Sequence, residues 1–101
     1  MMNKKLDGNV TVITGASSGM GAAIARRFTR EGSKVVLSAR RADRIHKLSE
    51  EISASGGEAL VIPADVADAD QVDNLVKETV KKFNRLDIMV NAAGFGTLKP
   101  L

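Results

Sequence analysis

Three glycines lie close together near the start of the chain, Gly15, Gly19 and Gly21, in the stretch TVITGASSGMG. The stretch follows a run of β-branched residues and precedes a run with helical spacing, which places the glycines in a strand-to-helix turn. Glycines there let the backbone bend sharply and approach a ligand, and the helix N-terminus offers N–H groups to a phosphate. The spacing predicts a diphosphate-binding loop, for which the candidate residues are Gly15, Ser17, Ser18, Gly19, Met20 and Gly21.

Glycine-rich turns of this kind also occur in proteins that bind no dinucleotide. A tight turn that binds nothing is the simplest alternative, because such turns are common. A P-loop is excluded, since no Gly-Lys-Ser/Thr follows the glycines. A methyltransferase stays open on the glycines alone, although it would normally have an acidic residue at the end of the second strand for the ribose hydroxyls. The residues at that position therefore carry further information.

The second apolar run ends in VVLSARR, which places Arg40 about 20 residues beyond the glycines. An NAD site has Asp or Glu there, because a carboxylate accepts hydrogen bonds from the ribose 2′-hydroxyl and repels a 2′-phosphate. An arginine does the reverse, since its guanidinium pairs with phosphate. The sequence therefore predicts NADP(H) as the preferred cofactor, with NAD(H) as the alternative. Arg41 either assists or begins the next helix, and a solvated basic pair is the other interpretation.

The elements around these residues alternate between short apolar runs and longer amphipathic runs. Successive apolar, mostly β-branched residues at 9–14, 34–38, 59–63 and 87–91 predict strands that are buried on both faces. Helical spacing predicts one helix over about 19–31, a second over about 42–53, and a third that follows Asp68 as N-cap. Gln71 would complete a variant of the capping box. The third helix is expected to bury Val72, Leu75, Val76, Val80 and Phe83.

The order β-α-β-α-β-α-β requires parallel strands, because each connection contains a helix. We therefore predict an α/β fold in one domain of 101 residues, a doubly wound parallel (Rossmann) sheet of four strands and three helices. The expected strand order is 3-2-1-4. The glycine loop would then lie at the crevice where the first and fourth strands diverge.

Composition excludes several classes of function. Lys and Arg number 15 against 12 Asp and Glu, and only 3% of the residues are aromatic, which argues against a nucleic-acid surface. No apolar run reaches the ~20 residues of a membrane-spanning helix. The chain has no cysteine, which excludes disulfides and thiolate metal sites and is compatible with the cytoplasm, where we expect it. His46 is expected to be a solvated surface residue, and no metal site is expected.

Three motifs together resemble the short-chain dehydrogenase/reductase family. TGASSGMG at 14–21 fits the family's TGxxxGxG pattern, and ADV at 64–66 and NAAG at 91–94 follow in the right order. The resemblance covers nearly the whole chain. It implies that the Asp65 side chain bonds the adenine amino group, with the Val66 backbone beside it. It also implies that the central crevice is lined by Asn91, Ala92, Ala93 and Gly94, where Ala92 replaces the family's commoner Asn. Ser18 stands where many NADP-preferring members have Lys or Arg.

The same resemblance implies a chemistry that this chain does not contain. The family transfers hydride between nicotinamide and a small-molecule carbonyl or alcohol, with a tyrosine as general acid/base and a lysine four residues later. The chain has no tyrosine and ends at FGTLKPL, soon after the fourth strand. We therefore expect it to be the cofactor-binding half of an NADP-dependent oxidoreductase, without catalytic residues and inactive by itself.

Two alternatives and one further expectation complete the prediction. The chain could be a stand-alone, non-catalytic dinucleotide-binding or regulatory module, or a remnant that keeps the fold but binds nothing. The face of the sheet that has a single helix would leave apolar residues uncovered, and the fourth strand would be an open edge. We therefore expect the 101-residue chain to self-associate, to exchange elements with a second copy, or to be only marginally stable.

Overall fold

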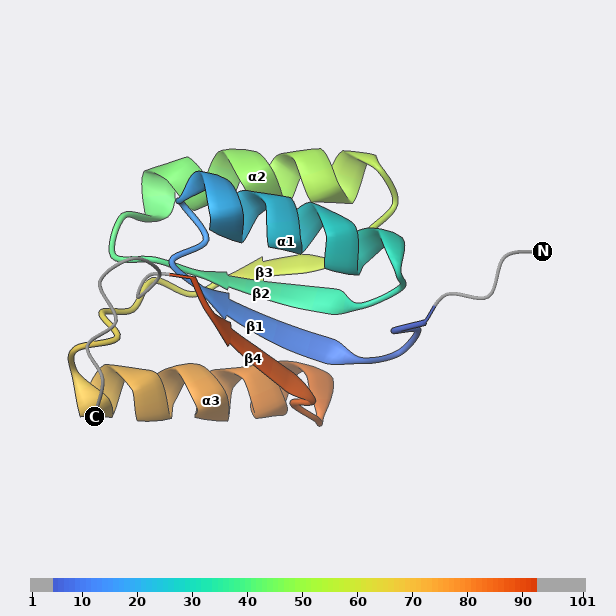
Figure 1. Cartoon of the computed structure of the whole chain (residues 1–101). Helices are drawn as coiled ribbons and strands as arrows, with labels where there is room; N and C mark the ends of the chain where they lie inside the picture. Colours follow the sequence, from blue (N-terminus) through green and yellow to red (C-terminus); the bar gives the residue numbers. More distant parts are fainter. Residues whose placement is uncertain (1–4, 93–101) are drawn as a thin grey trace, which may run out of the picture.

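The computed structural model describes residues 5–92 of the chain. Strands and helices alternate along this part of the chain as predicted (Figure 1). All strand pairs are parallel and the sheet order is β3-β2-β1-β4, which confirms the predicted doubly wound arrangement. In chain order the elements are β1 (Val10–Thr14), α1 (Gly19–Arg30), β2 (Lys34–Ser38), α2 (Ala42–Ala54), β3 (Ala59–Val61), α3 (Ala69–Phe83) and β4 (Ile88–Asn91).

The sheet separates two hydrophobic cores, with α1 and α2 on one face and α3 on the other (Figure 1). Strand alternation directs Ile13 and Leu37 to the α1/α2 face, where they pack with Ile45 of α2. Val12 and Val36 point the other way and pack with the buried Leu75 of α3. Because β1 lies between two strands and beneath helices on both faces, all of its residues are buried.

The face of α3 that packs on the sheet differs from the prediction. Of the five residues expected to be buried, Val72, Val76 and Phe83 are only partly buried. Leu75 is buried as expected, but Val80 is 42% exposed, so its predicted burial is wrong. Thr79 is fully buried instead, because its hydroxyl donates to the Leu75 carbonyl at 2.8 Å and needs no partner in the core. Val80 follows one position later, about 100° around the helix, which turns it away from the sheet.

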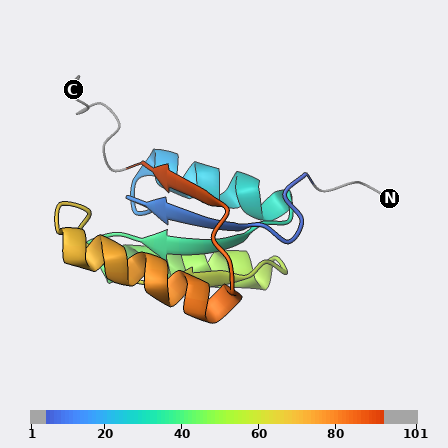
Figure 2. The same ribbon diagram turned by 90° about the horizontal axis from the view of Figure 1, so that it is seen from below.

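The coverage of this second face is uneven. Figure 2 shows α3 in front of β2 and β3, whereas no helix of the described part of the chain lies in front of β4. Met89 of β4 is accordingly 46% exposed. An apolar side chain is therefore left open to solvent at the edge of the sheet.

The predicted third strand is shorter than expected, since β3 ends at Val61 and not at Pro63. The chain nevertheless continues beside β2: the Ile62 N–H donates to the Leu37 carbonyl at 3.0 Å, and the Ala64 N–H to the Ala39 carbonyl at 3.2 Å. These two bonds fix the position of the residues that follow Ala64.

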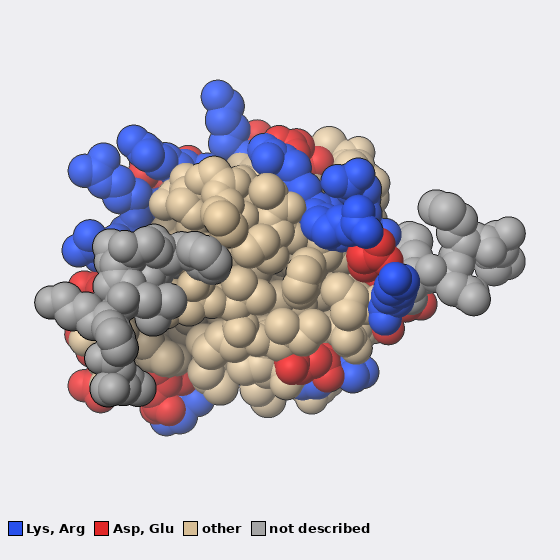
Figure 3. All heavy atoms as spheres, viewed as in Figure 1, with Lys and Arg blue, Asp and Glu red and all other residues tan. Residues whose placement is uncertain are grey.

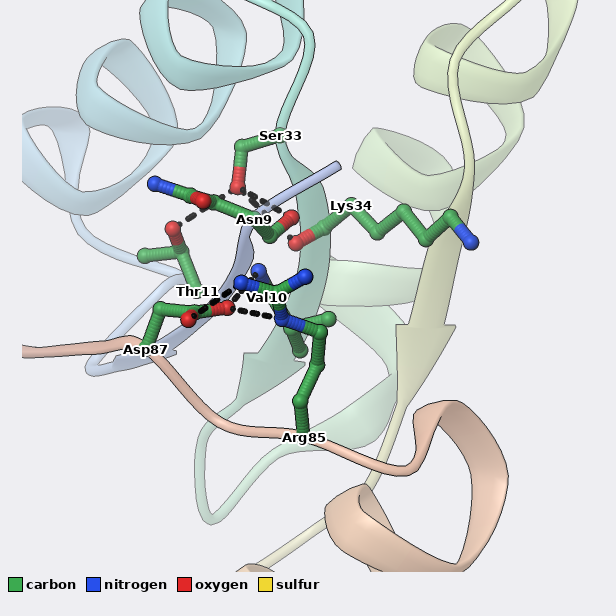
Figure 4. Close-up of polar contacts among 7 residues, drawn as sticks. All are labelled: Asn9, Val10, Thr11, Ser33, Lys34, Arg85 and Asp87. Carbon is green, nitrogen blue, oxygen red and sulfur yellow. Dashed lines mark hydrogen bonds and ion pairs between the residues drawn. The ribbon is translucent and has the colours of Figure 1, made fainter. Parts of the chain in front are cut away.

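A polar contact at the amino end of the sheet holds β4 beside β1 (Figure 4). The Asp87 carboxylate accepts a hydrogen bond from the Val10 N–H at 2.8 Å and pairs with the Arg85 guanidinium at 2.8 and 2.9 Å. Both contacts favour the ionised carboxylate, so the bond from Arg85 and then the bond from Val10 lower the pKa of Asp87 below its ordinary value of 3.8. The charge on Asp87 therefore helps to set where β4 begins.

Replacing Asp87 with Asn should lower the melting temperature at pH 7, because the amide keeps an acceptor for Val10 but loses the charge that pairs with Arg85. A carboxylate with a lowered folded pKa stabilises the fold above its ordinary value of 3.8 and loses that contribution as the pH falls through the folded pKa. The difference in melting temperature between wild type and Asp87→Asn should therefore shrink below about pH 4.

Thermal melts followed by circular dichroism between pH 2 and 7 measure this difference. Asp73→Asn is the matched control, because Asp73 is an exposed carboxylate that pairs only within α3, with Lys77 at 2.9 Å. A gap between wild type and Asp87→Asn that stays constant down to pH 2 would show that the charge of Asp87 contributes nothing.

Candidate dinucleotide-binding site

The glycine loop between β1 and α1 is closed by its own hydrogen bonds. Gly15 leaves the strand with φ +69°, a conformation that favours glycine. The Ser18 N–H and hydroxyl both donate to the Gly15 carbonyl, at 3.0 and 2.8 Å. The same hydroxyl accepts from the Gly21 N–H at 2.9 Å, so Ser18 is the N-cap of α1. The loop therefore has one fixed shape, with the helix start beside the carboxyl end of β1.

Gly19 and Gly21 have different roles in this loop. A Cβ at Gly21 would overlap the Gly15 carbonyl oxygen and lie 2.9 Å from the Ala16 Cα, so Gly21 is required by the packing of the helix start on the loop. A Cβ at Gly19 would meet no other atom within 4 Å. No described contact accounts for the missing side chain at Gly19, and the open space above it fits a phosphate that approaches the helix N-terminus.

A hollow of about 930 Å³ opens at the carboxyl ends of the strands. Residues that follow all four strands of the described chain contribute to it. They are Gly15, Ser17 and Ser18 after β1, Ala39, Arg40, Arg41 and Arg44 after β2, Ala64, Asp65, Val66 and Ala67 after β3, and Ala92 after β4. Basic side chains lie at this end of the molecule in the space-filling view, and a second group lies at the opposite end (Figure 3).

The basic wall of the hollow contains one residue that the sequence did not indicate. Arg40 and Arg41 were candidates, but Arg44 in the first turn of α2 lines the same hollow. All three are exposed, and none forms an ion pair with a carboxylate among residues 5–92. Asp65 is the one acidic residue among those that line the hollow. The sequence could have indicated Arg44, because it follows Arg40 by four residues and lies in the first turn of the predicted second helix, close to the end of the second strand.

The loop after β3 is held in place by side chains of its own and of α3. The Asp65 carboxylate accepts from the Ala67 N–H at 2.9 Å, and the Asp65 N–H donates to the Gln71 side-chain oxygen at 2.8 Å. Asp68 caps α3 as predicted, accepting from the N–H groups of Asp70 and Gln71. The Gln71 side chain does not accept from the Asp68 N–H, as a capping box would require. It donates instead to the Asp68 carboxylate at 3.2 Å and accepts from the Asp65 N–H, so it links the helix cap to the loop.

The end of β4 is tied to the end of β1. The Thr14 hydroxyl donates to the Asn91 side-chain oxygen at 3.0 Å, and the Ala92 N–H donates to the Thr14 carbonyl at 3.0 Å. Ala92 is 5% exposed and lines the hollow, whereas Asn91 does not line it and is held by Thr14. The candidates Ala93 and Gly94 lie outside the described residues.

The structure therefore gathers most, but not all, of the candidate residues at the hollow. Of the candidates, the lining includes Gly15, Ser17, Ser18, Arg40, Asp65, Val66 and Ala92, and does not include Gly19, Met20, Gly21 and Asn91. Met20 is 48% exposed on α1.

His46 is exposed on α2, and no group of three potential metal ligands occurs within residues 5–92. None of the helices described here has both the length and the apolar character to cross a bilayer.

Comparison with known proteins identifies the family. The family model of the short chain dehydrogenases matches residues 9–101. The chain belongs to this family. The chain is 47% identical over 89 residues to the glycine betaine reductase ATRR of Emericella nidulans, and this alignment covers 88% of the chain and 7% of that protein.

Solved structures of short chain dehydrogenases have the same fold. Hydroxysteroid dehydrogenase from Escherichia coli has a TM-score of 0.84 at 35% identity, over 88% of this chain and 38% of that chain. The 3-ketoacyl-(acyl-carrier-protein) reductase from Brucella melitensis, complexed with NADH, has a TM-score of 0.76 at 37% identity, over 84% of this chain and 34% of that chain. The chain thus spans well under half the length of each of these three relatives.

The two helix-start glycines should respond differently to alanine. Gly21→Ala should lower the free energy of unfolding by about 2 kcal/mol or more, because the new methyl group overlaps backbone of the glycine loop. Gly19→Ala should leave it unchanged or raise it by about 0.5 kcal/mol, because the space is open and the unfolded chain loses entropy. Urea unfolding of the two variants measures both effects, and equal losses would contradict these separate roles.

Proposed function

We propose that this chain binds NADP(H) and forms the cofactor-binding part of an oxidoreductase that transfers hydride between nicotinamide and a small-molecule carbonyl or alcohol. The observation that carries the proposal is the basic wall after β2, where three arginines without a described carboxylate partner line the hollow beside the glycine loop. A dianionic 2′-phosphate would balance two of these three charges and accept several guanidinium hydrogen bonds.

The relatives support the oxidoreductase part of the proposal. Their names describe reductases and a dehydrogenase, and one was solved with NADH. NADH lacks the 2′-phosphate, so NAD(H) remains the second candidate cofactor and the two must be compared directly. Hydride transfer to or from the nicotinamide is the chemistry that such a cofactor supplies when bound. The open helix start at Gly19 and the loop around Asp65 would hold its phosphates and adenine.

We further propose that these 101 residues do not catalyse hydride transfer alone. The sequence contains no tyrosine, and the described part of the chain brings no alternative proton donor of suitable geometry to the hollow. A non-catalytic dinucleotide-binding module is therefore the second candidate function for the chain as it stands. The cytoplasmic location predicted from the cysteine-free sequence stays a prediction.

Side-by-side titration of the chain with NADPH and NADH tests the cofactor. NADPH should bind more tightly, and Arg40→Asp should weaken NADPH binding at least about tenfold while leaving NADH binding equal or tighter. The matched control is Lys47→Glu, which makes the same change of charge on α2 outside the hollow. Tighter binding of NADH by the wild type would establish NAD(H) as the cofactor and contradict the role given to Arg40.

We also propose that the chain self-associates through a second copy at β4. This strand is the edge of the sheet beyond β1, and its Met89 is 46% exposed on a part of the face that no described helix covers (Figure 2). An edge strand offers backbone groups for pairing, and an apolar side chain there favours association.

Met89→Lys should raise the dissociation constant of the self-associated species about tenfold, because a charged side chain at an edge opposes pairing. Sedimentation of the wild type and the variant over a range of concentrations measures this change. Met20→Lys is the control, since Met20 is similarly exposed but lies on α1. A wild type that stays monomeric at all concentrations would contradict self-association.

A further inference from the structure

The order of the strands also fixes the order of the groups around the hollow. Because the sheet runs β3-β2-β1, the residues after β2 lie between the glycine loop after β1 and Asp65 after β3. In a bound dinucleotide the adenosine ribose lies between the diphosphate and the adenine. The basic wall therefore occupies the place where a substituent on that ribose would lie.

Arg44 differs from Arg40 in the element that carries it. Arg40 follows directly from β2, whereas Arg44 belongs to the first turn of α2 and lines the hollow from the helix. One guanidinium forms two parallel hydrogen bonds to a phosphate, which leaves further acceptor positions on a dianion with three terminal oxygens. A second arginine that approaches from another element can satisfy them.

The position of Arg44 is unfavourable for α2 when nothing is bound. A positive charge in the first turn of a helix opposes the positive end of the helix dipole, and Asp43 in the same turn offsets only one such charge. The N-cap of α2 is Arg41, which makes no side-chain capping bond, whereas Ser18 caps α1 and Asp68 caps α3. An anion held in the hollow beside this turn would offset the repulsion. Departures from the usual capping and charge preferences of a helix start are expected where the helix start binds a ligand.

We propose that Arg44 is a second 2′-phosphate-binding residue, which acts with Arg40 to select NADP(H) over NAD(H). The inference rests on the proposed NADP(H) function and extends it, because it assigns part of the selectivity to α2 and not only to the end of β2. Arg40 binds the phosphate from the strand end, and Arg44 binds it from the helix.

Binding of two small probes by the 101-residue chain tests the inference. Adenosine 2′,5′-bisphosphate and adenosine 5′-monophosphate differ only in the 2′-phosphate, so the ratio of their dissociation constants measures its recognition without the nicotinamide. Titration calorimetry should be run on wild type, Arg40→Ala, Arg44→Ala and Lys47→Ala. Lys47 lies on the same helix, is exposed and does not line the hollow, so Lys47→Ala controls for the loss of one charge on α2.

Arg44→Ala should reduce the preference for the bisphosphate about fivefold, with the affinity for the monophosphate within about twofold of wild type. Lys47→Ala should leave the preference within about twofold. The melting temperature of Arg44→Ala without ligand should equal or exceed that of wild type, because a repulsive charge is removed from the helix start. Arg44→Lys should retain only part of the preference, since an ammonium cannot bond in the bidentate manner.

Each contrary result has a separate meaning. If Arg40→Ala lowers the preference but Arg44→Ala behaves as Lys47→Ala does, Arg44 makes no contact with the phosphate and the inference is overturned, while the NADP(H) proposal stands. If the wild type shows no preference for the bisphosphate, or binds neither probe, both the inference and the NADP(H) proposal are overturned.

Discussion

The position of β1 is the constraint on which the rest of the structure depends. This strand has a parallel neighbour on each side, and helices pack over both of its faces, so all of its residues are buried. A strand in that position can leave the sheet only at its ends. At the carboxyl end it turns at Gly15 into a helix that packs back over the sheet. The hollow lies beside this turn and is lined by residues that follow each of the four strands.

The two ends of the sheet consequently differ in their chemistry. At the amino end the polar groups bond one another, as Asp87 does with Arg85 and Val10, and Ser33 with Thr11 at 2.8 Å (Figure 4). At the carboxyl end the basic side chains of the β2–α2 connection have no described acidic partner. Charges that are paired within the protein contribute to the fold, and charges that are left over are available to a ligand.

Much of this arrangement could be predicted from the sequence because it follows from local patterns. Runs of β-branched residues located the strands, and the alternation of strands and helices gave the order of the sheet. The glycines, Arg40 and Asp65 could be named because each follows directly from a strand end, where position along the chain determines position in space. Side chains on helices were harder to place. Val80 was wrongly expected in the core. Neither the place of Arg44 at the hollow nor the bond from the Asp65 N–H to the Gln71 side chain was predicted. Each of these depends on how a helix is rotated against the sheet.

Ser18 has a consequence for where positive charge can be placed around the hollow. Its hydroxyl accepts from the Gly21 N–H and donates its only proton to the Gly15 carbonyl, so that proton is already used at the start of α1. A lysine or arginine at this position would supply a cation at the cost of the cap, which contributes about 1 kcal/mol. The chain keeps a capped first helix on one side of the hollow and has its cations on the other side, in the β2–α2 connection and in the first turn of α2, which has no side-chain cap. The capping of α1 and the positive charge around the hollow thus depend on residues on different sides of it. Substitutions that change the charge after β2 would therefore leave the cap of α1 intact.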